Sequence, residues 1–308
     1  MSVAGAVLAC ATLLACSGPT PAPAAAPAAG AGAPPSAAVT VAIPPVTVTV
    51  NNPGAGPRTT LVLHATPESA QQVSLTSTST ISQTIGTNPP SDQSSPEVTL
   101  PLTARPHGPA DAATHTVGLT IGTPSSPDTT LSDALAKAVG STSTVTVTPA
   151  GAVSQLVLDP PAALSDAGRS AAEQAQRQAI QFLPVLPGEP VGVGAVWTVS
   201  QQIDSLGLGL RQDTVLTLNA MRDSTITLGV QVTQTPLTPT WTLPNDQGTL
   251  NVDSYRVTGG GTLTLTLDLT KPLPLDGRVQ LNGNEVFSRP KDGLKLAQQI
   301  GNGVSWKS

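Results

Sequence analysis

The sequence predicts a mainly β fold (α+β), in which an antiparallel curved sheet, a half-barrel or a sandwich, is accompanied by one main helix and one or two short helices. Apolar and polar residues alternate with a period of two through most of the chain, which places successive side chains on opposite faces of strands. Turns rich in Gly and Asp separate these segments, as in antiparallel meanders. Aromatic residues make up only 2% of the chain, so we expect an aliphatic core.

Residues 1–15 are predicted to be a signal peptide, because a short apolar run ends in the lipobox Leu13-Leu14-Ala15-Cys16. A membrane-spanning helix needs ~20 apolar residues, and this run is shorter. Cleavage would leave Cys16 as the site of lipid attachment, for an acyl group such as palmitate. One feature departs from the pattern, since no Lys or Arg precedes Arg58 and signal peptides begin with a positive region. We expect an extracytoplasmic protein that is anchored through Cys16 to the cell membrane, or to the outer membrane of a cell that has two membranes.

Residues 16–38 are predicted to hold the lipidated cysteine and a linker. The stretch after Cys16 contains six prolines and ten alanines in 22 residues and has no charge. Proline stops helix propagation, and Ala and Gly bury little surface. Cys10 would be removed with the leader, so the predicted domain at 39–308 has no cysteine for a disulfide.

The first half of that domain, 39–158, is predicted to consist mostly of strands. Pro44 and Pro45 confine the first alternating segment, 39–50, to a sheet edge or split it into two short strands. A short helix is expected at 130–140, with a glycine at its end. The other expected strands are 59–65, 72–85, 98–104, 114–121, and the hairpin 142–148 with 152–158.

The main helix is predicted at 159–183, and a second strand-rich half, 184–308, follows it. An apolar line with helical spacing marks this helix, and its many alanines permit close packing on a sheet. The line comprises Leu164, Ala167, Ala171, Ala175, Ala179 and Phe182. Expected strands are 196–203, 209–219, 224–233, 249–257, 261–269 and 277–287, with turns at 245–248 and 282–285 and a short helix at 294–300.

Several classes of function are disfavoured. The net charge is −5 and the 14 Lys and Arg residues are scattered, so we expect no nucleic-acid partner. The histidines His64, His107 and His115 form no HExxH motif, and the chain has no GxSxG elbow. We therefore predict no metal, no cofactor and no catalytic residue. A hydrolase is a less favoured alternative, and it would need a cleft containing at least two of these histidines.

One segment carries a resemblance to a known family. The segment begins with the hairpin at 147–158, which is followed by a helix and a PxxPVxxGxxW motif, and it ends with 257–287, which contains three consecutive glycines. This order of features resembles a family of bacterial extracytoplasmic lipoproteins with no assigned activity. The motif residues are Pro187, Pro190, Val191, Gly194 and Trp197. The resemblance covers roughly 130–290 and implies no catalytic residue. The expected architecture is also similar in outline to that of lipid-carrying lipoproteins of the periplasm and the mycobacterial envelope.

The strand faces suggest a binding function. Leu263, Leu265, Leu267 and Leu269 share one face of an alternating segment, and few helices are available to cover such faces. A sheet with too little cover is expected to keep a groove for an apolar or amphiphilic ligand, such as a lipid. The alternative is a structural or protein-interaction module of the cell envelope, in which these faces pack against each other.

Overall fold

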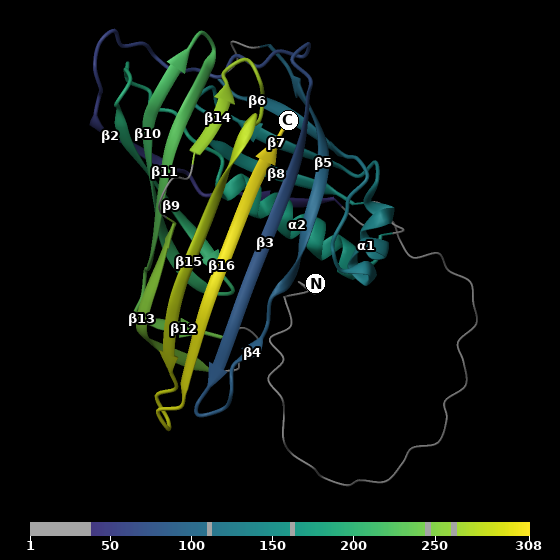
Figure 1. Ribbon diagram of the computed structural model, residues 1–308, viewed down its shortest axis with the longest axis vertical. Coiled ribbons are helices and arrows are strands. Elements are labelled where there is room, and N and C mark those ends of the chain that lie inside the picture. Colours follow the sequence, from purple (N-terminus) through teal and green to yellow (C-terminus); the bar gives the residue numbers. More distant parts are fainter. Residues whose placement is uncertain (1–37, 110–112, 161–163, 244–247, 260–263) are drawn as a thin grey trace, which may run out of the picture.

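The computed structural model describes residues 38–109, 113–160, 164–243, 248–259 and 264–308. Sixteen strands in these ranges belong to one sheet, and all their pairings are antiparallel. The sheet curves around one long helix, α2 (Asp166–Gln181), and a shorter helix, α1 (Thr129–Leu135), lies beside one end of it (Figure 1). The predicted fold class, a mainly β protein with a curved antiparallel sheet, is confirmed.

The strands before α2 follow the predicted alternation closely. A 3-10 turn, Ala136–Ala138, continues α1. The strands are β1 (Val39–Ala42), β2 (Thr47–Asn52), β3 (Gln71–Ile85), β4 (Ser91–Asp92), β5 (Ser95–His107), β6 (His115–Ile121), β7 (Thr142–Val147) and β8 (Val153–Asp159).

The strands after α2 are mostly longer. They are β9 (Val196–Ser205), β10 (Leu208–Arg222), β11 (Thr225–Pro236), β12 (Thr240–Thr242), β13 (Thr249–Gly259), β14 (Thr264–Asp268), β15 (Asp276–Ser288) and β16 (Lys295–Lys307). The strand order is β1-β8-β7-β6-β5-β3-β16-β15-β13-β11-β10-β9-β2. The two strand-rich halves therefore join along β3 and β16, which pair from Ser74 opposite Lys307 to Ile85 opposite Leu296.

The two ends of the sheet lie near each other. β1 pairs with β8 at one end, and β2 pairs with β9 at the other. Only residues 43–46 connect them, and a chain spans at most ~3.6 Å per residue. The two ends are therefore within about 18 Å. Pro44 and Pro45 split this segment into two edge strands, as predicted, and so bring the sheet almost to closure.

Helix α2 begins later than the sequence suggested. Asp159 is the last residue of β8, where it pairs with Thr142, and the helix starts after Ser165, whose Oγ accepts a hydrogen bond from the Gly168 amide at 3.3 Å. The buried face is also turned relative to the predicted line. Ala167 is exposed, and the buried residues within the helix are Gly168, Ala172, Ala175, Gln176, Ala179 and Ile180.

Two local predictions near the C-terminus were wrong. Residues 295–300 form part of β16 and not a helix, because Leu296, Gln298 and Ile300 lie opposite alternate positions of β3. The segment 282–285, expected to be a turn, lies within β15. A Cβ on Gly283 would lie 2.6 Å from the Arg256 carbonyl oxygen, so this glycine serves the close approach of β13 and not a turn.

Two other predictions need smaller corrections. Residues 60–65 form no ladder, because their backbone bonds go to separate loops: the Leu63 amide donates to the Pro149 carbonyl and the His64 amide to the Leu269 carbonyl. His107 ends β5 and does not lie in the loop expected there. The predicted turn at 245–248 lies mostly outside the described residues, as do Leu263, Cys16 and residues 1–37.

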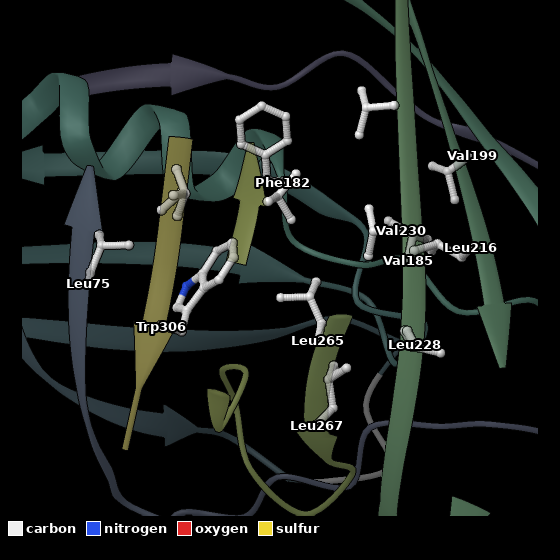
Figure 2. Close-up of a cluster of buried hydrophobic side chains, with 14 of the residues drawn as sticks. Leu75, Phe182, Val185, Val199, Leu216, Leu228, Val230, Leu265, Leu267 and Trp306 are labelled. Atoms are coloured by element: carbon white, nitrogen blue, oxygen red, sulfur yellow. The ribbon is translucent and has the colours of Figure 1, made fainter. Parts of the chain in front are cut away.

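The main core fills the space between α2 and the concave face of the sheet. Figure 2 shows Phe182, at the C-terminal end of α2, above side chains from β3, β9, β10, β11, β14 and β16. A smaller cluster lies apart from it and comprises Leu208, Leu210, Trp241, Leu250 and Phe287, with the Trp241 and Phe287 rings 4.9 Å apart. None of the helices in the described ranges combines the length and apolar character needed to cross a membrane.

Candidate ligand site

Helix α2 is attached to the concave face by glutamine side chains. Gln176 Oε1 accepts a hydrogen bond from the Ser143 hydroxyl of β7 at 2.5 Å. Gln178 bonds to β3, accepting from the Ser77 hydroxyl at 2.5 Å and donating to the Thr78 carbonyl at 3.3 Å. Gln181 donates to Gln212 of β10 at 2.8 Å. The helix thus bridges three strands that are well separated in the order of the sheet.

The apolar part of this attachment is small. Gly168 and three alanines make up most of the buried helix face. Such side chains bury little area, and apolar burial contributes only about 25 cal/mol per Å². Each hydrogen bond contributes a net ~1 kcal/mol, because water replaces it when the helix moves away. Ile180 is the one large aliphatic side chain on this buried face. The apolar attachment of α2 is therefore weaker than that of a helix that presents Leu or Ile at every buried position.

Three cavities meet beneath the C-terminal end of α2. The first, which we call the apolar cavity, has a volume of about 30 Å³ and an almost wholly apolar surface. Its walls come from β3, β5, β6, β7, β16, α2 and the β14–β15 connection. They are Leu75, Leu102, Val117, Leu119, Val145, Val147, Gln176, Ala179, Ile180, Leu183, Pro272, Leu273 and Trp306.

The second, the rim cavity, also has a volume of about 30 Å³. It differs from the apolar cavity because two basic side chains, His115 and Lys271, line it. Its other walls are Leu63, Ala65, Val147, Gly151, Leu183, Pro184, Leu267, Pro272, Leu273 and Pro274. It shares Val147, Leu183, Pro272 and Leu273 with the apolar cavity, so the two spaces adjoin at these side chains.

The third, the gap cavity, has a volume of about 20 Å³ and lies where the two ends of the sheet approach. Ile43 and Val46 of the β1–β2 connection line it, together with Gln181 and Leu183. Leu183 is thus a wall of all three cavities. A volume of 20–30 Å³ holds one or two water molecules, so in this conformation the space beneath α2 is too small for an acyl chain.

A row of buried amides crosses the concave face below the cavities. Gln181 and Gln234 both donate to Gln212 Oε1, at 2.8 and 2.9 Å, and the Tyr255 hydroxyl donates to Gln234 at 3.2 Å. Glu285 lies opposite Tyr255 in the sheet. Farther along, Gln298 donates to Gln83 at 2.7 Å. The row separates the main core from the Trp241 and Phe287 cluster.

Glu285 is the carboxyl group in this row, and its burial changes its pKa. Its side chain is buried, with 8% of the residue exposed. Burial raises the pKa of the Glu285 carboxyl to about 7, against a smaller opposing effect of the hydrogen bond with Tyr255. Burial and the neighbouring Glu285 carboxyl raise the pKa of the Tyr255 hydroxyl well above its usual range. Near neutral pH the row therefore carries a carboxyl group that is partly protonated.

The three histidines do not share a cleft. His64 and His107 are exposed, whereas His115 is buried in the wall of the rim cavity. The exposed His107 imidazole lies beside Gly118 of β6. In the part of the chain that the structure describes, no group of three His, Cys, Asp or Glu residues is arranged to hold a metal ion. The arrangement offers apolar walls with a few polar groups, which suits binding more than group transfer.

Sequence reasoning missed most of this site. Lys271 and Gln176 were not singled out, and Glu285 was assigned to a turn. The alternation of Val279, Leu281 and Phe287 across that supposed turn is the signal that could have placed Glu285 on an inward face. Comparison of the sequence with protein-family models and with curated proteins gave no match.

Proposed function

We propose that this protein is a lipid-anchored, extracytoplasmic binding protein that holds an apolar or amphiphilic molecule beneath helix α2 and catalyses no reaction. The observation that carries the proposal is the convergence of three cavities at Leu183, under a helix whose glutamine side chains hydrogen-bond to the sheet. Displacement of α2 and Leu183 would join the cavities into one space. The walls of the apolar cavity are almost entirely carbon, so a hydrocarbon chain there would replace the contacts that the helix loses.

The ligand part of this proposal is tested by native mass spectrometry of the full chain after gentle extraction, and by titration with a panel of lipids. We expect one bound amphiphile per chain. The variant Gln176→Ala, which removes the bond to Ser143, should load ligand faster than Gln174→Ala, which changes an exposed glutamine of the same helix. Absence of any co-purifying lipid, together with no binding to the panel, would refute the binding function.

The anchor part of the proposal rests on the sequence alone, on the lipobox at Cys16 and the uncharged Pro/Ala linker after it. Replacement Cys16→Ser removes the only thiol of the predicted mature chain and should release the protein from the membrane fraction. Cys10→Ser, within the predicted leader, is the matched control and should leave the protein bound. Retention of the Cys16→Ser protein in washed membranes would contradict an acyl anchor.

A second candidate function is a structural or interaction module of the cell envelope. It is favoured by the small size of the cavities, none of the three exceeding about 30 Å³, because a filled interior needs no ligand. The same titrations separate the two functions. A chain that binds no amphiphile but is crosslinked in intact cells to one defined envelope protein would favour the module.

A further inference from the structure

The rim cavity contains a buried polar group without a partner. His115, the first residue of β6, is only 6% exposed, and its Nδ1 atom has no hydrogen-bond partner among the described residues. A buried polar atom without a partner costs free energy, and a ligand group that enters the rim cavity and bonds to this atom would recover that cost. Burial lowers the pKa of His115, and the neutral imidazole has one N–H to donate.

A cation lies on the same cavity wall. Lys271 belongs to the connection between β14 and β15, and its amide donates to the Asp268 carbonyl at 2.8 Å. The rest of this connection is fixed by the buried Gln71, which accepts from the Leu273 amide at 3.0 Å and donates to the Pro274 carbonyl at 3.2 Å. The position of Lys271 at the cavity is therefore set by the fold.

The Lys271 ammonium group remains able to pair with an anionic ligand. None of the three ion pairs between described residues includes it. Its charge acts on the carboxyl of Asp268. Burial disfavours ionisation of that carboxyl, but hydrogen bonds from Thr270 and Ser224 and the charge of Lys271 outweigh burial and lower the pKa. Asp268 Oδ1 already accepts two hydrogen bonds from Thr270, at 2.9 and 2.8 Å, so it is held at the turn.

The rim cavity, with its polar groups, adjoins the apolar cavity, as the head group and the chain of an amphiphile require. The rim cavity holds the imidazole and the ammonium group, and the apolar cavity beyond Leu183 and Leu273 is lined almost entirely by carbon. A head group at His115 would therefore direct its chain into the apolar cavity.

We propose that His115 and Lys271 bind the carboxylate of a single-chain fatty acid, whose hydrocarbon chain passes Leu273 and Leu183 into the apolar cavity beneath α2. This inference rests on the proposed binding function and adds the identity of the head group. The Nδ1–H group of His115 donates to one carboxylate oxygen, and Lys271 pairs with the carboxylate charge. One donor and one cation match one carboxylate.

The test compares dodecanoate with dodecan-1-ol, which has the same chain and no charge. The full chain carrying Cys16→Ser is titrated without detergent by calorimetry. We expect dodecanoate to bind at least tenfold more tightly than the alcohol, because a charge-assisted contact is worth a factor of this size. Lys271→Gln should remove that preference by weakening the binding of dodecanoate. Lys291→Gln, an exposed lysine between β15 and β16, is the control and should alter neither.

The outcomes separate the two proposals. Equal binding of acid and alcohol, unaffected by Lys271→Gln, would overturn the carboxylate site and leave the binding function standing. Binding of neither compound would overturn both. Dodecyl phosphate forms a third arm, and tighter binding of the phosphate than of the acid would refute a carboxylate site. In nitrogen-15 NMR spectra, the His115 Nδ1 resonance should shift with dodecanoate and stay in place with the alcohol.

Discussion

Replacement of Glu285 by glutamine should stabilise the protein, and the gain should depend on pH. The carboxyl lies on the concave face of β15, opposite Tyr255 of β13 on one side and Gln298 of β16 on the other. Its burial disfavours the charged form. Glutamine has nearly the same shape, stays neutral at every pH and can still hydrogen-bond to Tyr255.

The magnitude follows from the pKa of Glu285 in the folded and unfolded chain. Folding raises this pKa from 4.5 to about 7. Each pH unit is worth about 1.4 kcal/mol, so ionisation of the buried carboxyl costs ~3 kcal/mol of the free energy of unfolding. Between pH 4.5 and about 7 the folded chain binds more protons than the unfolded chain, and stability therefore falls as pH rises through this window. Above it the loss is complete and constant.

The assay is urea unfolding followed by tryptophan fluorescence, since Trp197, Trp241 and Trp306 are all buried. We expect the difference between Glu285→Gln and the natural protein to grow from near zero at pH 4 to ~3 kcal/mol at pH 8. His115 titrates with the opposite sign, because burial lowers its pKa, but it is present in both proteins and cancels.

Glu97→Gln, at an exposed position of β5, is the control and should show no such trend. A pH-independent difference between Glu285→Gln and the natural protein, or greater stability of the natural protein at pH 8, would refute the reasoning.

Two further substitutions test the architecture. Gly192→Ala should lower the free energy of unfolding by ~1–3 kcal/mol, because its Cβ would overlap the Ala55 carbonyl oxygen, whereas Gly188→Ala meets open space and should change it by less than ~0.5 kcal/mol. Equal effects would mean that the two segments are not in contact. Gln176→Ala should speed amide exchange of α2 roughly fivefold to tenfold relative to Gln174→Ala, since the bond to Ser143 is lost. Equal exchange would show that the glutamine bonds do not hold the helix.

Alternation in the sequence was sufficient to predict most strands. Its period directly reports which side chains face the core, as in β6 and β7, where every second residue is buried. Alternation failed as a guide where one segment fits both the period of a strand and the period of a helix. Leu296 and Ile300 have the spacing of one helical turn, and their place in β16 depends on pairing with β3, more than 200 residues earlier.

The candidate site was less predictable because its members are distant in the chain. His115 and Lys271 come together only through the curvature of the sheet and the path of the β14–β15 connection. No local pattern marks such a pair. The small size of the cavities was not predictable for a similar reason, since Leu183 and Leu273, which line two of them, come from segments outside the strands.

The most direct test of binding beneath α2 is crosslinking with a fatty acid that carries a photoreactive diazirine near the end of its chain. After irradiation of the loaded full chain, proteolysis and mass spectrometry locate the adduct. Binding beneath α2 predicts adducts on β6 and β7, in the peptides containing Val117, Leu119 and Val145, and excess unlabelled fatty acid should reduce them. Adducts confined to exposed segments, or labelling that excess fatty acid does not reduce, would contradict it.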